Sequence, residues 1–472
     1  MQTTSTGGAH EEKRVAIIHF SDVSSSLIAS LKEEGIKTCA ISMPFFLREK
    51  NSRLWESQGI QSVITDIQTV IQAKALAIYR LERTSEPRRN WHWSSLGEDT
   101  RHNCYIQLQK YNFQLGLNIT ESYLFINCII SACYELISEY QAELIVWGII
   151  PHSLFDYAFM KTAQSCGIRQ LLFQEFSYCR NGSFMYTPDL EIVPRSEKHC
   201  TGKNDLSLAD AERMAMQVLA KGKAALCDSE VALGAVRTYV PNGFEIDVSR
   251  AYLNARDSEE LDCINTIENF YRMTGEVTSL GTTKTVLTER LSRLRSKGYK
   301  KFMVLFLSSE PELTISPMCR ELSSSFEFML QLLDFLPAEY ALFIKEHPGV
   351  ILERLPENKR PWTKQLQDVR PKELIGQINN CDRIEWCPMS TGLLDLKRHG
   401  VSLLATTAGT VGYEGIILGI PVICRASTPY AHLPCAYRIA NEREERTFDD
   451  FAEQARRYLD NTSPAERSHQ IT

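Results

Sequence analysis

The stretch LATTAGTVGYEGIILGIPVICRASTPYAHL, from Leu404 to Leu433, decides the fold of this chain. With the residues just before it, it predicts a buried strand over Val401 to Thr406, a tight loop of small residues, a short helix and a second strand over Ile420 to Cys424. A strand, a helix and a further strand at this spacing are typical of a parallel sheet covered by helices. We therefore expect an α/β fold.

The loop inside this stretch has the composition of an anion-binding turn. Ala408, Gly409 and Thr410 would place free backbone N–H groups and a hydroxyl at the N-terminus of the short helix. The unpaired amides and the helix dipole both favour negative charge there. Glu414 follows on the same helix, and a carboxylate can accept hydrogen bonds from a ribose diol. A phosphate cradle beside a diol acceptor predicts a nucleotide site.

A strand further upstream is expected to reach the same ligand. Tyr340 to Lys345 (YALFIK) predicts a buried strand that runs directly into Glu346-His347-Pro348-Gly349. In an open α/β sheet the ligand lies outside the carboxyl ends of the strands, so one sheet would aim His347 and the Gly409 loop at one ligand. A histidine there can donate to a phosphate oxygen, and Pro348 restricts the path of the backbone.

These segments belong to a set of four motifs: Glu310-Pro311-Glu312 with Thr314 and Pro317, Lys345-Glu346-His347-Pro348, Gly409-Thr410-Val411-Gly412-Tyr413-Glu414, and Gly419-Ile420-Pro421-Val422 with Tyr430. In this order they resemble the bacterial capsule polysaccharide biosynthesis proteins, the group that contains the Kdo transferases of capsule assembly. The resemblance covers about 140 residues toward the C-terminus. Over residues 1–300 it is fainter, and is carried by Val146-Trp147-Gly148 with Pro151-His152 and by Phe173-Gln174-Glu175.

The resemblance implies a GT-B-like fold, in which two Rossmann-like domains face a cleft. We expect a disordered N-terminus (1–12), an N-terminal Rossmann-like acceptor domain (13–182), a mainly helical insert or linker (183–300), a C-terminal Rossmann-like nucleotide-sugar-binding domain (301–440) and a C-terminal helix that crosses back to the N-terminal domain (441–472). Strand and helix patterns alternate in both expected domains, whereas residues 183–300 show mainly helical periodicity.

Composition excludes several classes of protein. The chain has 472 residues, 43% of them apolar, which suffices for two or three domains of about 100–200 residues each. The net charge of −6 argues against a nucleic-acid-binding protein. The fourteen cysteines contain no CxxC pair and fit neither a disulfide framework nor a metal site. A polar N-terminus without an apolar core and the lack of a membrane-length apolar run predict a cytoplasmic protein, with the inner face of the cytoplasmic membrane as a second location.

The resemblance assigns roles to residues of the C-terminal half. His347 would donate to the phosphate leaving group, because fixed donors neutralise the charge that develops as a sugar–phosphate bond breaks. Thr407 and Thr410 are hydroxyl donors to phosphate or helix N-cap residues. Tyr430 would close over the base or sugar, or pack in the core. The donor site as predicted consists of Lys345, His347, Pro348, Thr407, Gly409, Thr410, Glu414, Glu310 and Tyr430.

The general base is expected at a strand end of the N-terminal domain. Glu175 follows the strand Arg169 to Phe173, which is the place where related transferases carry an acidic pair followed by glycine. Here the sequence Gln174-Glu175-Phe176-Ser177 lacks both the second acid and the glycine. Acceptor-side alternatives are Asp22, which follows the first strand, and His152 with Asp156, which follow the strand ending at Trp147.

Together these observations predict a metal-independent glycosyltransferase that needs no cofactor. Its donor would be a nucleotide sugar, CMP-linked first and UDP-linked next, and its acceptor a glycan or lipid-linked glycan of surface or capsular polysaccharide. A nucleotide-sugar 2-epimerase and a non-catalytic nucleotide- or glycan-binding protein of an assembly complex are the alternatives. A serine or cysteine hydrolase and a phosphate-loop kinase are disfavoured, because the sequence has neither a nucleophile elbow nor a Walker motif.

Overall fold

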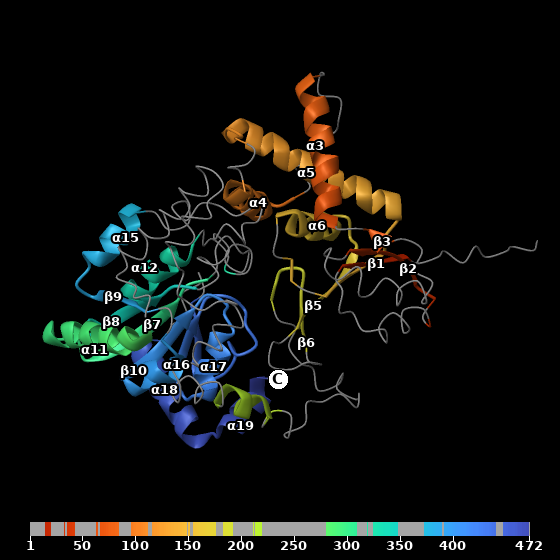
Figure 1. The fold of residues 1–472 in the computed structure, drawn as a ribbon. Helices are drawn as coiled ribbons and strands as arrows, with labels where there is room; N and C mark the ends of the chain where they lie inside the picture. The colour runs from red at the N-terminus through yellow and green to blue at the C-terminus, as the bar shows by residue number, and fades with distance from the viewer. Residues whose placement is uncertain are drawn as a thin grey trace, which may run out of the picture. The chain divides into compact units, whose positions relative to one another are not determined.

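The structure, a computed structural model, forms two compact units, each built around one six-stranded sheet (Figure 1). It describes residues 15–19, 33, 35–42, 63–64, 67–84, 96–111, 116–148, 150–151, 154–175, 183–191, 211, 213–219, 280–308, 319, 324–347, 372–388, 391–439 and 447–471.

The first unit contains a sheet with the strand order β3-β2-β1-β4-β5-β6. Its strands are β1 (Val15–His19), β2 (Lys37–Ser42), β3 (Val63–Ile64), β4 (Leu144–Trp147), β5 (Arg169–Glu175) and β6 (Ser183–Tyr186). The first five strands pair in parallel, and β6 pairs antiparallel with β5. This is the doubly wound order in which the chain reverses direction across the sheet between β1 and β4.

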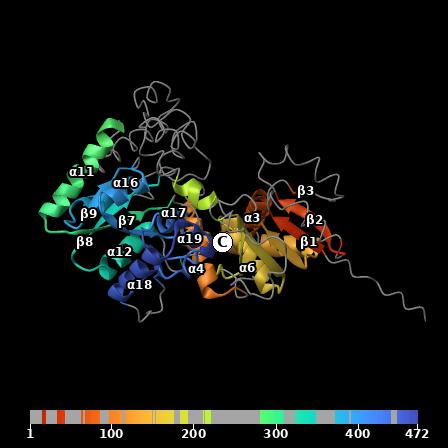
Figure 2. The ribbon, with the colours of Figure 1, turned by 90° about the horizontal axis from the view of Figure 1, so that it is seen from below.

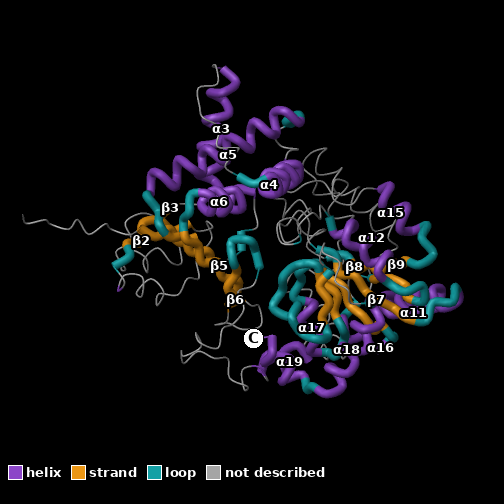
Figure 3. Tube along the Cα trace, turned by 180° about the vertical axis from the view of Figure 1, so that it is seen from behind, coloured by secondary structure: helices purple, strands orange, loops and turns teal. Residues whose placement is uncertain are grey.

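The described helices of this unit are α3 (Ile67–Thr84), α4 (Glu98–Tyr111), α5 (Ile119–Tyr140) and α6 (Leu154–Ser165). Helix α5 begins with a capping box, in which the Asn118 side chain accepts from Glu121 N at 2.9 Å and Asn118 N donates to the Glu121 carboxylate at 3.1 Å. Its apolar residues are buried against α3 and α6, so that α5 is the centre of a helical layer (Figure 3).

The second unit repeats the same order with all strands parallel, β12-β11-β10-β7-β8-β9. Its strands are β7 (Lys301–Phe306), β8 (Tyr340–Lys345), β9 (Ile384–Cys387), β10 (Val401–Thr406), β11 (Val422–Cys424) and β12 (Ala436–Arg438). Every residue of β8 is buried. A parallel strand is covered by helices on both faces, which explains the unbroken run YALFIK.

The described helices of the second unit are α11 (Leu280–Ser296), α12 (Ser325–Phe335), α15 (Lys372–Asn379), α16 (Leu393–Arg398), α17 (Val411–Ile417), α18 (Phe448–Asn461) and α19 (Pro464–Ile471). Figure 2 shows the strands between α12 and α18 on one side and α11 and α16 on the other. An aromatic cluster joins α18 to α12, with Phe448 packing edge-on against Phe335 and Tyr340.

The predicted α/β class with two Rossmann-like domains is confirmed by these two sheets. The structure differs from the expected organisation at both ends of residues 183–300. At the start, Ser183–Tyr186 forms an edge strand of the first sheet, and residues Ser183–Val193 belong with the first unit. At the end, α11 packs on β9, where Arg290 donates to the carbonyl of Trp386 and Arg293 pairs with Glu385 at 3.1 Å. Between them, residues 211 and 213–219 are helical.

Both C-terminal helices make contacts within the second unit. Phe451 of α18 packs on Tyr437, and Arg467 of α19 donates to Ile416 O at 2.7 Å. The expected crossing of this segment to the N-terminal domain stays a prediction, since each unit is described by itself. Among the described helices, none combines the length and the apolar character needed to cross a membrane.

Two cysteine thiols in the helical layer of the first unit are completely buried. Burial raises the pKa of Cys104 in α4 to about 12, although Lys161 lowers it slightly. Burial also raises the pKa of Cys133 in α5 well above its ordinary value, and the neighbouring Cys104 raises it further. The folded protein therefore holds both thiols in the neutral form.

These thiols predict alkaline destabilisation of the first unit. Above the ordinary thiol pKa of 9.0 the unfolded chain releases the Cys104 proton, whereas the folded chain retains it up to about pH 12. The contribution of the Cys104 thiol to the free energy of unfolding is therefore fully present below pH 9 and is lost as the pH rises toward 12. We expect wild type to lose about 2 kcal/mol more than Cys104→Ala between pH 8 and 10.5 in urea unfolding. The difference between the free energies of unfolding of the two proteins at pH 7 measures the loss of packing alone. If both free energies changed equally with pH, the prediction would be contradicted.

Candidate functional site

The candidate site lies at the carboxyl edge of the second sheet, at the point where the chain switches direction. The two central strands, β7 and β10, are neighbours in parallel register, and their connections leave toward opposite sides of the sheet. Ser308 follows β7 and Thr407 follows β10, and their hydroxyl oxygens are 2.6 Å apart. This hydrogen bond joins the two chain segments at the topological switch point, where open α/β sheets bind their ligands.

The loop from Thr407 to Thr410 is held by its own strand. Thr406 Oγ1 accepts a hydrogen bond from Gly409 N at 3.0 Å, and Thr407 O accepts from the amides of Arg425 and Ala426. Among the described residues, no hydrogen bond uses the amides of Ala408, Thr410 and Val411. The loop therefore carries three N–H groups without an intramolecular acceptor. Thr410 is exposed and makes no side-chain cap.

Tyr430 packs under this loop. Its side chain is 2% exposed, and its hydroxyl donates to Gly409 O at 2.8 Å. A Cβ atom added to Gly412 would lie 2.3 Å from the Tyr430 ring, so the ring occupies the space that a side chain at position 412 would need. These contacts place the Tyr430 ring in the interior of the unit, and its contact with a base or sugar stays a prediction. Tyr430 supports the loop from inside the unit.

The end of β8 brings three polar residues to the same edge. Lys345 is 7% exposed, and its ammonium group lies over the Phe306 ring at 5.6 Å from the centroid. Glu346 is 2% exposed and its carboxylate accepts a hydrogen bond from His347 N at 2.8 Å. His347 is exposed. Strand β8 ends at Lys345, so His347 lies two residues beyond the strand and is exposed where Lys345 and Glu346 are buried.

Glu414 and the glycine loop remain together in the structure. Glu414 lies in the first turn of α17, is partly exposed, and its amide donates to Thr410 O at 3.2 Å. Thr407 is completely buried and its hydroxyl bonds to Ser308, so it ties strands together at the base of the site. His347, Gly409, Thr410 and Glu414 are thus the predicted residues that reach the carboxyl edge with exposed or partly exposed atoms.

In the first unit, Glu175 is the last residue of β5 and pairs with Ser183 of β6. It therefore lies at the carboxyl edge of its own sheet. Asp156 is 1% exposed in the first turn of α6. Asp22 and His152, as well as Glu310 and Pro348 of the second unit, lie outside the described residues.

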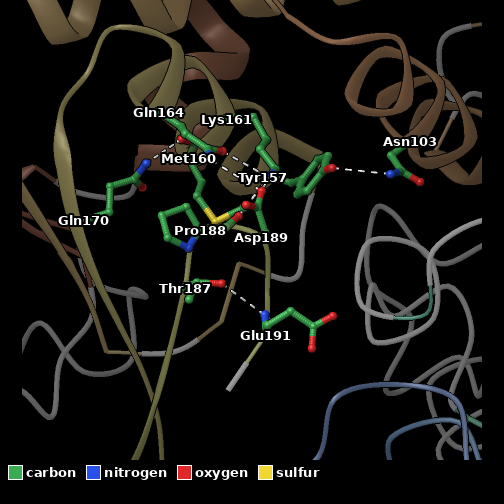
Figure 4. A network of polar contacts seen from close by, with 10 residues as sticks. All are labelled: Asn103, Tyr157, Met160, Lys161, Gln164, Gln170, Thr187, Pro188, Asp189 and Glu191. Atoms are coloured by element: carbon green, nitrogen blue, oxygen red, sulfur yellow. Dashed lines mark hydrogen bonds and ion pairs between the residues drawn. The ribbon is translucent and has the colours of Figure 1, made fainter. Parts of the chain in front are cut away.

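A polar network in the first unit has a structural role (Figure 4). Lys161 donates to Pro188 O at 2.8 Å and to the Asp189 carboxylate at 2.9 Å, which ties the turn after β6 to α6. Gln170 donates to Met160 O at 2.8 Å. Since Leu172 pairs with Tyr186, this turn lies beside the amino end of β5. The network is at the opposite edge of the sheet from Glu175.

Sequence reasoning missed Ser308 and Thr406. Thr406 ends the predicted strand Val401 to Thr406, and Ser308 follows the apolar run KFMVLFL over residues 301–307. Thr406 has a local partner in Gly409, whereas the partner of Ser308 depends on the strand order, because Ser308 meets Thr407 across 99 positions of the chain.

The similarity of this chain to known proteins is low. No family model matches the sequence, and no curated protein matches it. Among solved structures, the β-Kdo 2,7-transferase KpsC of Thermosulfurimonas dismutans has 18% identity and a TM-score of 0.22, over 37% of this chain and 52% of that one. The match therefore spans about half of that protein.

Several other solved structures match over nearly the whole chain. The UDP-GlcNAc 2-epimerase of Methanocaldococcus jannaschii, in complex with UDP-GlcNAc and UDP, has 10% identity and a TM-score of 0.26, over 96% of this chain and 94% of that one. The MnaA–UDP structure from S. aureus has 11% identity and a TM-score of 0.22, over 97% and 90%. At these values the function has to be argued from the site itself.

The packing of Tyr430 on Gly412 predicts the effect of a single methyl group. Gly412→Ala would drive its Cβ into a buried ring, and we expect the second unit to lose about 1–3 kcal/mol of stability. Gly376→Ala in α15 is the matched control, because no atom lies within 4 Å of its added Cβ. There alanine should be neutral or stabilising by up to about 1 kcal/mol. Thermal unfolding of both variants measures the difference, and equal effects would contradict this packing.

Proposed function

We propose that this protein is a glycosyltransferase that binds a nucleotide-activated sugar at the carboxyl edge of its second sheet. The observation that carries the proposal is the hydrogen bond between Ser308 and Thr407, because it fixes the segments that leave the two central strands at the switch point. Ligands of doubly wound sheets bind in the crevice at this point.

The groups around the switch point are suited to different parts of one ligand. The amides of Ala408, Thr410 and Val411 and the Thr410 hydroxyl suit phosphate oxygens. The carboxylate of Glu414 suits a diol, and His347 suits a second anionic oxygen or a leaving group. Strand β7 lies between β10 and β8, so the two ends that carry the loop and His347 are about 10 Å apart. A nucleoside phosphate can extend over this distance, whereas a single phosphate ion cannot.

The proposed reaction is a displacement at the anomeric carbon. The acceptor hydroxyl forms the new C–O bond, the sugar–phosphate bond breaks, and the nucleotide leaves with the bonding electron pair. His347 and the loop amides stabilise the negative charge that develops on the leaving phosphate. Glu175 takes the proton of the acceptor hydroxyl, with Asp22, His152 and Asp156 as alternatives. No metal ion takes part in this scheme.

The donor and acceptor follow from the resemblance of the motifs. Lys345-Glu346-His347-Pro348 resembles the element of transferases that use CMP-linked acidic sugars, so a CMP-sugar is the first choice and a UDP-sugar the second. The acceptor would be a glycan or lipid-linked glycan of surface polysaccharide, met in the cytoplasm or at the inner membrane face.

The nucleotide site is tested by ligand-induced thermal shifts with CMP, CDP, UDP and GDP. A ligand that binds only the folded protein stabilises it by about 2.7 kcal/mol at a hundredfold excess over Kd. We expect one nucleotide to raise the Tm of wild type, and His347→Ala to lose most of this shift. His102→Ala, which removes an exposed histidine of α4 in the first unit, should retain it. No shift with any nucleotide would contradict the proposal.

An activity assay with the nucleotide so identified separates the enzymatic alternatives. A transferase releases nucleotide from its donor sugar only with an acceptor glycan, and the rate should be unaffected by a chelator and reduced at least about 100-fold in Glu175→Gln. Conversion of the nucleotide sugar to an isomer without an acceptor would identify a 2-epimerase instead. Binding without either reaction would identify a non-catalytic protein.

A further inference from the structure

Helix α17, which follows the glycine loop, ends in a tightly bonded turn. Gly419 has φ +74°, its amide donates to Ile416 O at 3.0 Å, and Ile420 N donates to Gly415 O at 2.8 Å. This is the Schellman arrangement, in which a left-handed glycine lets the chain reverse after the last helical residue. Carbonyl groups of the last turn face outward from such an end and attract cations.

Two cationic side chains from distant parts of the chain meet this end. Arg467 of α19 donates through Nη1 to Ile416 O at 2.7 Å and through Nη2 to Thr462 O at 2.9 Å. Lys397 donates to Leu418 O. A Cβ atom added to Gly419 would lie 3.2 Å from the Arg467 guanidinium and 3.4 Å from the Lys397 ammonium. Burial lowers the pKa of Lys397, and Arg467 lowers it further.

A second contact joins the two helices at the first turn of α17. The hydroxyls of Tyr413 and Ser468 are 2.8 Å apart, and both side chains are completely buried. Arg467 is 7% exposed. Helix α19 therefore contacts α17 through two consecutive buried polar residues, Arg467 and Ser468. The two helices lie side by side (Figure 3).

We infer that α19 is a latch that positions α17 and, through it, the glycine loop of the candidate nucleotide site, with Arg467 and Ser468 as its positioning residues. Helix α17 has only seven residues, too few to be stable without tertiary contacts. Tyr430 packs on the first turn of α17, and α19 contacts the helix at both Tyr413 and Ile416, so loss of the latch removes contacts from both turns. The part of the inference that concerns ligand affinity rests on the proposed function; the part that concerns α17 does not.

Hydrogen exchange on the full chain tests the latch without a ligand. Arg467→Met keeps an unbranched apolar side chain and removes the guanidinium donors, and we expect the hydrogen-bonded amides of residues 407–417 to exchange about tenfold faster. The strands β7 and β8 should exchange as in wild type. Arg457→Met is the matched control, because Arg457 is an exposed arginine of α18 whose ion pair is with Glu453 on the same helix. Unchanged exchange at 407–417, or faster exchange throughout the second unit, would overturn the inference.

A second variant covers the case in which Arg467→Met does not fold. Ser468→Ala removes one hydroxyl from the Tyr413 contact and should speed exchange in the same residues by a smaller factor, about threefold. Exchange as slow as in wild type would contradict the latch.

Nucleotide affinity gives the second readout. If wild type binds a nucleotide, both variants should raise its Kd, Arg467→Met more than Ser468→Ala, because affinity falls with the fraction of molecules that hold the loop in its binding conformation, while Arg457→Met should not. An unchanged Kd despite faster exchange would overturn the link between the latch and the loop. If wild type binds no nucleotide, the proposed function fails, and hydrogen exchange alone decides whether α19 holds α17.

Discussion

In a doubly wound sheet, the chain segments that follow the two central strands leave toward opposite sides. The two segments therefore separate at one point of the carboxyl edge. The second unit closes this point with a hydroxyl pair, Ser308 two residues after β7 and Thr407 directly after β10. The backbone of Thr407 also accepts the amides of Arg425 and Ala426, which follow β11. One buried threonine thus connects the ends of three adjacent strands, and the orientation of the glycine loop that follows it depends on these bonds.

The composition of the loop has a packing reason as well as a chemical one. At position 412 a side chain would overlap the Tyr430 ring, and at position 409 it would lie 2.7 Å from the Thr406 hydroxyl. Both glycines let the chain approach groups that hold it, and the same small residues leave nearby amides accessible. The glycines of this motif are therefore required by the packing of the local fold as well as by the ligand-binding role proposed for the loop.

The central strands and the order of the four motifs could be predicted from the sequence, because buried parallel strands such as Tyr340–Lys345 and Val401–Thr406 appear as continuous apolar runs. The short strand Ser183–Tyr186 could not, since four residues of an edge strand carry little periodicity. The donor-site candidates were identified as residue types, but their individual placements depend on tertiary contacts. Thr407 turned inward to Ser308, and Tyr430 packed beneath the loop, because the strand order and the adjoining turn put partners there.

The contact between Arg467 and Ile416 also has a consequence for synthesis of the chain. The two residues are 51 positions apart, so α17 and the loop before it emerge from the ribosome well before the residues that hold their far end. At about 5–20 residues per second, this interval lasts roughly 3–10 s. During it the strands β7, β8 and β10 can already pair, while the short helix beside them lacks its contacts with α19. The central sheet can therefore form on the nascent chain before the edge that carries the loop acquires its final order.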